Sequence, residues 1–162
     1  MSKTSKMDYF MRIAEVVATQ ATCLRRAVGC VLVNSRGHIR ATGYNGRAAG
    51  LLHCNMHDPM HKTGYPHACK GAFAKSGEQL DSCEAIHAEQ NALLQCPNVY
   101  DITACYVTVS PCITCVKLLM NTSCRAIYFR EEYPYLEEAR RLWLLNPERV
   151  WVKVPRGGHS RC

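Results

Sequence analysis

The sequence lacks the long apolar segments that characterise membrane proteins. No apolar run approaches the ~20 residues that a helix needs to cross a bilayer. The first residues also lack the unbroken apolar stretch of a secretion signal, because Asp8, Arg12 and Glu15 interrupt it. We therefore expect a protein without membrane contacts that works in the cytoplasm or in an equivalent reducing compartment.

Internal repeats and low-complexity segments are missing from the sequence as well. The 162 residues are enough for one domain with a substantial core and too few for two ordinary domains. Hydrophobic residues make up 48% of the chain and charged residues 20%, which is typical of a globular protein. We expect a single domain over residues 1–162, with an irregular insertion at about 46–83 and a short basic tail at 153–162.

Eleven cysteines are the most unusual feature of the composition. Their number is odd, and a reducing compartment disfavours disulfides, so a disulfide framework is the weaker interpretation. Thiolate sulfur and neutral imidazole are the preferred ligands of zinc, which favours metal binding. Cys30 and Cys105 fall inside strand-like runs, so we expect them to be core residues instead.

The formal net charge of the chain is +7. A basic surface suits nucleic acids, and it suits phosphorylated small molecules equally well. Part of the excess charge lies in the tail, KVPRGGHSRC, which we expect to be a frayed and solvated end.

The hydrophobic pattern predicts alternating helices and strands. Apolar residues at helical spacing between positions 7 and 17 indicate an opening amphipathic helix, and residues 28–34 and 39–45 indicate a β-hairpin. The remaining elements are predicted as helices at 86–96, 111–121 and 135–145 and strands at 105–110, 126–130 and 149–154. This order predicts an α/β fold of three layers, α/β/α, with a mixed sheet of about five strands.

Two short segments at predicted helix starts carry the residues of a metal site, CEAIHAEQNAL at 83–93 and SPCITC at 110–115. Cys112 and Cys115 are three residues apart, so both lie on one face of a helix. The partial positive charge of a helix N-terminus favours their thiolate forms. Together with His87 they supply three ligands, which leaves the fourth position of zinc open to water, as in catalytic sites.

Glu89 lies two residues after His87. Zinc lowers the pKa of a bound water to ~7, and a nearby carboxylate can take its proton and return it to the substrate. H-x-E followed by P-C-x-x-C is the signature of zinc deaminases, in which the glutamate is the general acid and base. Each half of this pattern is weak evidence alone, but both halves at helix starts predict a catalytic zinc site.

Longer segments of the chain resemble the cytidine deaminase superfamily, and within it most closely the deoxycytidylate (dCMP) deaminases. The resemblance extends from about Cys23 to Tyr133, and its segments occur in that family's order: CLRRAVGCVLVN, ATGYNG, GLLHC, CEAIHAEQNAL, YVTVSPCITC and the Tyr of YFREEY. It implies a cytidine deaminase-like fold and hydrolysis of dCMP to dUMP and ammonia, which supplies dUMP for thymidylate synthesis.

The resemblance also implies roles for single residues. Water attacks C4 of cytosine, and Glu89 passes a proton to N3 and then to the departing amine. Asn45 is expected to bind a sugar hydroxyl, the backbone of Ala88 the base O2, and the carbonyl of Ser110 the amino group. Tyr133 matches the family's aromatic residue near the nucleotide. The alternatives are a turn role for Asn45 and a partly buried ring without a ligand for Tyr133.

Arg25 and Arg26 are candidates for binding the phosphate of the substrate or of an effector, because a guanidinium group matches phosphate geometry. The alternative is a solvated pair of arginines at a helix end.

Some members of this family carry a second, structural zinc, and Cys23, Cys54 and Cys83 match the positions of its ligands. Such a metal would stabilise the irregular segment in place of a core. Candidates for the fourth ligand are His53, His57, His61, His67 and Cys69. The alternative is a set of buried free thiols and solvated histidines.

Many members of the family are hexamers that dCTP activates and dTTP inhibits. The resemblance therefore implies a homohexamer with an effector pocket near the hairpin and the GYNG segment, and Mg²⁺ accompanying a triphosphate effector. We do not expect nucleic acid to be a partner.

Two other functions remain open at this point. A tRNA adenosine deaminase would suit the net charge of +7. A non-catalytic, zinc-stabilised binding module is the alternative from another class, although a purely structural site has no use for Glu89.

Overall fold

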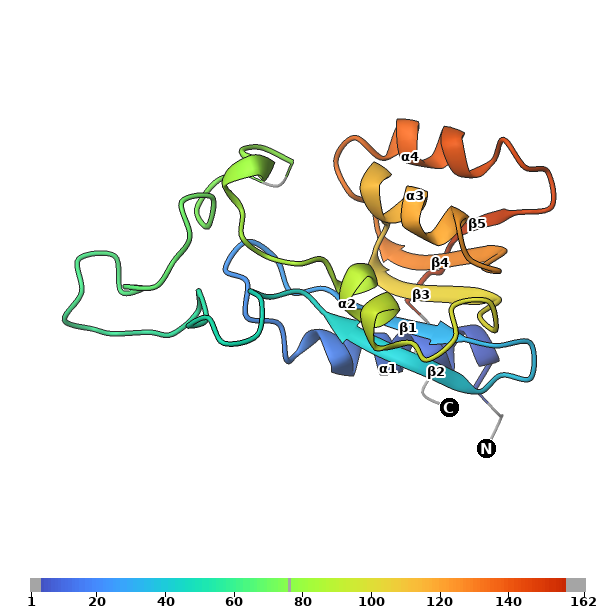
Figure 1. The fold of residues 1–162 in the computed structure, drawn as a ribbon, viewed down its shortest axis with the longest axis horizontal. Helices are drawn as coiled ribbons and strands as arrows, with labels where there is room; N and C mark the ends of the chain where they lie inside the picture. Colours follow the sequence, from blue (N-terminus) through green and yellow to red (C-terminus); the bar gives the residue numbers. More distant parts are fainter. Residues whose placement is uncertain (1–3, 76, 157–162) are drawn as a thin grey trace, which may run out of the picture.

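The computed structural model describes residues 4–75 and 77–156 of the chain. Its centre is a five-stranded sheet with the strand order β2-β1-β3-β4-β5 (Figure 1). The strands are β1 (Gly29–Val33), β2 (Ile39–Tyr44), β3 (Ala104–Val109), β4 (Ala126–Glu131) and β5 (Val150–Lys153). β1 pairs antiparallel with both β2 and β3, whereas β3, β4 and β5 are parallel to one another, so the sheet is mixed as predicted.

Helices cover both faces of the sheet. The four α-helices are α1 (Lys6–Ala18), α2 (Ala88–Gln95), α3 (Ile113–Met120) and α4 (Leu136–Trp143). Core residues of α1 pack on one face of the sheet, and those of α2, α3 and α4 pack on the other. This arrangement confirms the predicted order of elements and the three-layer α/β/α fold. Within the described part of the chain, none of these helices combines the length and the hydropathy needed to span a membrane.

Strand β1 contributes side chains to two hydrophobic cores, one on each face of the sheet. All five of its residues are buried, and alternate side chains point to opposite faces. Cys30 joins the core beneath α2, α3 and α4, whereas Val31 joins the core beneath α1. Cys105 lies in the same core as Cys30, and both are 0% exposed, which confirms that these cysteines are core residues.

Gly43 of β2 sets the position of helix α2. A Cβ atom at this position would overlap the backbone of Ala88 and Ala92, so the helix lies directly on the strand. Ala88 and Ala92 are both 0% exposed and are themselves small. The first turn of α2 is therefore held at a fixed height above the sheet.

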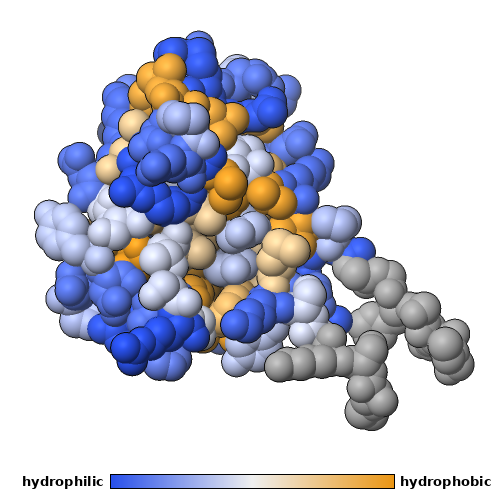
Figure 2. All heavy atoms as spheres, turned by 90° about the vertical axis from the view of Figure 1, so that its right-hand side faces the viewer, coloured by the Kyte–Doolittle hydropathy of each residue, from blue (hydrophilic) through white to orange (hydrophobic). Residues whose placement is uncertain are grey.

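Among its described residues, the segment predicted as an irregular insertion is mostly turns and loops, with a short 3₁₀ helix, η1 (Leu80–Ser82), and an isolated β-bridge from Gly46 to Ile86. Figure 1 shows it extending away from the sheet as a long loop. Its base is closed by Arg47, which donates to the carbonyls of Leu52 and His67 and pairs with Glu84. Figure 2 shows the opposite end of the molecule, where hydrophilic residues surround scattered hydrophobic ones.

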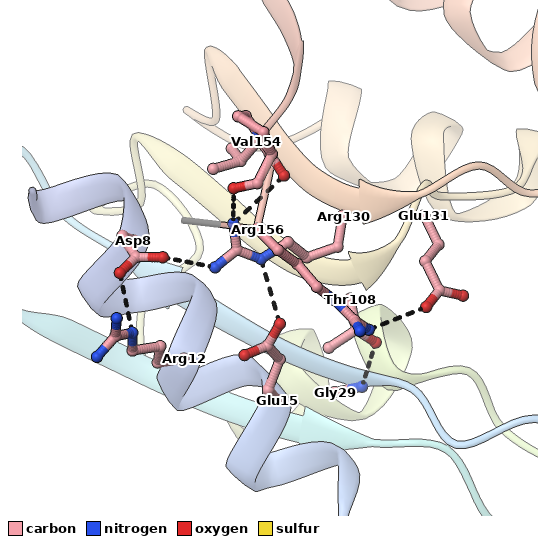
Figure 3. A network of polar contacts seen from close by, with 10 residues as sticks. Asp8, Arg12, Glu15, Gly29, Thr108, Arg130, Glu131, Val154 and Arg156 are labelled. Atoms are coloured by element: carbon pink, nitrogen blue, oxygen red, sulfur yellow. Dashed lines mark hydrogen bonds and ion pairs between the residues drawn. The ribbon is translucent and has the colours of Figure 1, made fainter. Parts of the chain in front are cut away.

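Arg130 of β4 ties three parts of the chain together (Figure 3). The side chain of Arg130 is only 4% exposed and forms ion pairs with Asp8 at 2.7 Å and Glu15 at 3.2 Å, both on α1. It also donates to the carbonyls of Val154 and Pro155. Its hydrogen bond to Asp8 holds the pKa of that carboxyl below its ordinary value.

These bonds correct the prediction for the C-terminal tail. Residues 153–162 were expected to be frayed and solvated, but Lys153 completes β5 and Val154 is 6% exposed within the core beneath α1. The backbone carbonyls that Arg130 binds hold the start of the tail in place, so tertiary contacts override its polar composition. The rest of the predicted tail, 157–162, lies outside the described residues.

Replacing Arg130 by methionine is expected to lower the free energy of unfolding by about 3 kcal/mol, because two carboxylates and two carbonyls lose their buried partner. We place the effect at the low end for a buried ion pair because Glu15 is 38% exposed. Urea unfolding measures the change. Arg156→Ala is the matched control, since that side chain is 77% exposed and should change stability by less than about 0.5 kcal/mol. Equal effects of the two substitutions would contradict the anchoring role of Arg130.

Candidate functional site

The structure brings His87, Cys112 and Cys115 together at the N-termini of α2 and α3. Nδ1 of His87 lies 3.5 Å from Sγ of Cys112 and 3.4 Å from Sγ of Cys115. Within the described ranges, these residues form the only group of three or more His, Cys, Asp or Glu side chains whose ligand atoms all lie within 4.8 Å of one another.

The spacing of these three atoms fits a zinc ion. Zinc bonds measure ~2.0–2.1 Å to imidazole nitrogen and ~2.3 Å to thiolate sulfur, so tetrahedral geometry places nitrogen and sulfur roughly 3.5 Å apart. Both observed distances agree with that value. Two thiolates and one imidazole are also the donor types that zinc prefers. His87, Cys112 and Cys115 are therefore a suitable set of three ligands.

Local sequence explains how each ligand is held. His87 and Cys112 are the N-cap residues of α2 and α3, and Cys115 lies in the first turn of α3. The side chain of Gln90 accepts a hydrogen bond from the backbone N–H of His87 at 2.9 Å, which fixes the backbone at this ligand. Sequence analysis did not assign a role to Gln90, although its i+3 spacing from His87 is that of a capping pair.

The environment shifts the pKa values of the Cys112 and Cys115 thiols in opposite directions. A hydrogen bond from Cys115, with a further one from His87, lowers the pKa of Cys112 to about 4. The Cys112 thiolate in turn raises the pKa of the buried Cys115. Cys112 also raises the pKa of His87 by accepting its hydrogen bond. Cys112 is therefore favoured as a thiolate, which is the form of cysteine that binds a metal ion.

Glu89 lies beside this group of ligands. It is 4% exposed, and its carboxyl group is close enough to hydrogen-bond with the Cys115 thiol. Burial raises the pKa of Glu89 to about 7. A carboxyl group with such a pKa can both accept and donate a proton near neutral pH, as a general acid and base must.

A pocket of about 620 Å³, including the space at its mouth, opens in front of these residues. The pocket contains every residue predicted to bind the nucleotide: Asn45, Ala88, Ser110, Tyr133, Arg25 and Arg26. It also contains His87, Glu89 and Cys112.

Asn45 and Ser110 fix the backbone around this pocket. The Asn45 amide accepts from the N–H of Val28 at 2.7 Å and donates to the carbonyl of Arg26 at 2.6 Å. It retains one donor and one acceptor position for a ligand. The Ser110 hydroxyl accepts from the backbone N–H of Tyr133 at 2.8 Å, so it holds that aromatic residue at the pocket.

Arg25 and Arg26 are half-buried. Both line the pocket, and the NH1 atom of each is buried without a hydrogen-bond partner among the described residues. Arg25 uses its NH2 atom to donate to the backbone carbonyls of Lys75 and Glu78. Both side chains therefore border the pocket, and each has a buried NH1 donor without a partner among the described residues.

Cys23, Cys54 and Cys83, predicted to hold a second metal, and their neighbour Cys69 lie near the base of the insertion, but among these described residues no three sulfur atoms all lie within 4.8 Å of one another. Cys54 and Cys69 are buried in one cluster, and Cys83 packs against it. Burial raises the pKa of Cys54 and of Cys83, and the neighbouring Cys69 and Cys23 add to these shifts. Among the histidines considered as a fourth ligand, His53, His57 and His61 are exposed and His67 is half-buried.

A zinc-binding family model matches residues 4–131 of the chain. The family is described as the cytidine and deoxycytidylate deaminase zinc-binding region. The matched range includes the three proposed ligands, Glu89 and strands β1 to β4.

Three relatives have similar sequences. A deoxycytidylate deaminase of Schizosaccharomyces pombe is 35% identical over 128 residues, which cover 78% of this chain and 37% of that protein. ComE operon protein 2 of Bacillus subtilis is 34% identical over 145 residues, or 85% of this chain and 67% of that protein. A deoxycytidylate deaminase of Mycobacterium phage D29 is 34% identical over 136 residues, or 82% of this chain and 99% of the phage protein.

The solved structure of a dCMP deaminase from the cyanophage S-TIM5, in complex with dCMP and dUMP, shares the fold. It has a TM-score of 0.67 and 23% sequence identity, and the superposition covers 95% of this chain and all of the phage chain. This chain spans less than half the length of the fission yeast relative, but nearly the full length of the D29 protein. The extent of the family match and these identities show that the chain belongs to the cytidine and deoxycytidylate deaminase family.

Proposed function

We propose that this protein hydrolyses dCMP to dUMP and ammonia. The observation that carries the proposal is the pocket itself, which is lined by the zinc ligands His87 and Cys112, by the buried Glu89 and by the side chains of Arg25 and Arg26. In this proposal the pyrimidine base reaches the metal ligands and the phosphate binds the guanidinium groups. The names of the relatives from S. pombe and phage D29, both deoxycytidylate deaminases, support the same substrate.

Glu89 is the proposed catalytic residue. When bound by His87, Cys112 and Cys115, zinc supplies Lewis-acid activation of a water molecule. The Glu89 carboxylate takes a proton from this water and delivers it to N3 of the base, while oxygen adds at C4. Glu89 then transfers the second proton to the amine as the C4–N4 bond breaks. One water is consumed, and dUMP and one ammonia are formed.

The residues around the pocket orient the nucleotide in this proposal. The backbone N–H of Ala88 donates to O2 of the base, and the carbonyl of Ser110 accepts from the 4-amino group. Asn45 uses its remaining donor and acceptor for a sugar hydroxyl. Tyr133, held by the Ser110 hydroxyl at 2.8 Å, packs against the nucleotide. Burial raises the pKa of Tyr133, so its hydroxyl is neutral and does not repel a phosphate.

We assign the phosphate to Arg25 and Arg26. Replacing Arg26 by alanine is expected to raise KM for dCMP by at least about tenfold, because a hydrogen bond to a charged group contributes about 1.5–3 kcal/mol. KM for deoxycytidine, which has no phosphate, should change little. Arg36→Ala removes the same charge from an exposed position in the hairpin turn and is the control. The assignment is wrong if the two substitutions change KM for dCMP equally.

We further propose a second, structural zinc at the base of the insertion, held by Cys23, Cys54 and Cys83. Burial of Cys54 and Cys69 in one cluster supports Cys69 as the fourth ligand, in preference to the exposed histidines. Four thiolates form a closed coordination shell, which suits a structural metal. Such a site would stabilise a segment that has few buried apolar residues of its own.

The remaining features of the proposal rest on the sequence. Length and composition favour a single domain and a cytoplasmic location, and the family resemblance implies a homohexamer, activation by dCTP with Mg²⁺, inhibition by dTTP and the supply of dUMP for thymidylate synthesis. Ammonia release from dCMP, measured with and without dCTP, tests the substrate and the activator together. If zinc is bound and dCMP remains unchanged in the presence of dCTP, then tRNA adenosine, free cytidine and a non-catalytic binding role are the functions to test next.

A further inference from the structure

The insertion returns to the pocket after extending away from the sheet. Figure 1 shows the long loop between β2 and α2. Residues near the end of this loop line the pocket. Gly77, Cys83 and Ala85 line the pocket together with Arg25 and Tyr133. The end of the insertion is therefore part of the pocket wall, in addition to any structural role at its base.

Arg25 fastens this part of the insertion. Its NH2 atom donates to the carbonyl of Lys75, two residues before Gly77, and at 2.7 Å to the carbonyl of Glu78, one residue after it. Because both acceptors belong to the backbone, the bonds depend on where the chain runs and not on the side chains at 75 and 78. A single guanidinium nitrogen of Arg25 thus holds the backbone on both sides of Gly77 at the wall of the pocket.

Gly77 is confined from its other side by the segment that follows β4. A Cβ atom at Gly77 would lie 2.5 Å from Cε2 of Tyr135 and 3.8 Å from the hydroxyl of Tyr133. Tyr135 itself has a left-handed backbone with φ of 66°, although its side chain is 74% exposed. A side chain at position 77 would therefore require the exposed ring of Tyr135 or the backbone of the insertion to shift.

We propose that Gly77 is a specificity-determining residue, because the space left by its missing side chain sets the width of the pocket at the end that receives the phosphate. This inference rests on the proposed deamination of dCMP and extends it to the insertion. The neighbours of Gly77 place it at that end. Arg25 contacts its flanking carbonyls, and both Arg25 and Arg26 lie close enough for their charges to act on the Tyr133 hydroxyl. The ligand class that this wall selects is a nucleoside monophosphate, in contrast to a nucleoside.

Substituting alanine for Gly77 tests the proposal. A Cβ atom there forces the insertion or Tyr135 to move, so we expect KM for dCMP to rise about tenfold while kcat changes less than about twofold. KM for deoxycytidine should change less than about twofold. Gly50→Ala is the matched control, because Gly50 lies in the same insertion with a φ of 85°, close to the 87° of Gly77, but nothing lies within 4 Å of its Cβ position. Both variants place alanine at a positive φ, but only the Cβ atom at position 77 meets Tyr135 beside the pocket.

A second variant distinguishes the steric contact between Tyr135 and the methyl group added by Gly77→Ala from a general loss of folding in Gly77→Ala. Tyr135→Asn removes the ring, and asparagine tolerates a left-handed backbone. In the Gly77→Ala/Tyr135→Asn double variant, KM for dCMP should return to the value of Tyr135→Asn alone. The proposal is overturned if Gly50→Ala raises KM as much as Gly77→Ala, if deoxycytidine is affected as strongly as dCMP, or if the double variant shows no recovery.

The same variants distinguish failure of this inference from failure of the proposed function. If calorimetry shows that the wild-type protein binds dUMP but the protein does not deaminate dCMP, the proposed reaction is refuted. The role of Gly77 in nucleotide binding can then still be tested. In that case the dissociation constant for dUMP replaces KM, with the same expected tenfold change for Gly77→Ala and none for Gly50→Ala. An unchanged dissociation constant in Gly77→Ala would refute the inference independently of the reaction.

Discussion

The Glu89→Gln variant should deaminate dCMP about 10³-fold more slowly than the wild type, through a fall in kcat with little change in KM. General acid–base groups typically contribute about 10²–10⁴-fold to a rate. Glu89 is placed to serve in both proton transfers, because it is 4% exposed and lies beside the ligand Cys115. Glutamine keeps the shape of the side chain and its packing but cannot accept the proton. Steady-state ammonia release gives both constants.

The zinc content of Glu89→Gln provides the control for this prediction. Glu89 is not among the three residues whose ligand atoms come together, so the variant should bind as much zinc as the wild type. A variant that loses its zinc would show that Glu89 holds the metal. A variant that retains zinc and more than about a tenth of the wild-type kcat would show that another group moves the protons.

Loss of zinc should strongly reduce both the deaminase activity and the thermal stability of the protein. Cys115→Ser removes a buried ligand, so we expect zinc to fall well below one per site and deamination to become undetectable. A metal that binds only the folded protein stabilises it by about 2.7 kcal/mol at 100 times its dissociation constant. For a domain of this size, losing that contribution lowers Tm by roughly 5–10 °C. Metal analysis and thermal unfolding measure both effects.

Cys124→Ser is the matched control for Cys115→Ser. Cys124 is also 0% exposed, but its thiol donates to the carbonyl of Ala126 at 3.4 Å and lies outside the pocket. A serine hydroxyl can make the same bond, so this variant should keep its zinc and its activity. Chelation of the wild type should reproduce the loss seen in Cys115→Ser, and added zinc should reverse it. Full activity of Cys115→Ser or of the chelated protein would contradict a catalytic metal.

The main elements of the fold could be predicted because their patterns are local. Buried strands such as β1 are continuous runs of apolar residues, and the helices show their period in sequence. His87, Cys112 and Cys115 could be assigned to one site because each stands at the start of a predicted helix. Together they are the residue types and the number of ligands that a catalytic zinc site uses. The structure brings the three side chains to the distances that this prediction requires.

Contacts of the insertion could not be predicted in the same way. Arg25 bonds to carbonyls 50 and 53 residues away, and backbone carbonyls leave no signal in the identity of the residues that carry them. Gly77 appears in the sequence as one glycine among ten, and only the fold shows which of them faces a tyrosine ring. The anchoring of the C-terminal segment escaped prediction for a similar reason, since the carbonyls of Val154 and Pro155 are held by Arg130.

Ammonia release from dCMP by the zinc-loaded protein, measured beside Glu89→Gln, tests the central claim most directly. The account predicts one ammonia for each dUMP formed by the wild type, and a loss of about 10³-fold in the variant at equal zinc content. No release by the wild type with zinc bound and dCTP present would contradict the assignment of this pocket to dCMP.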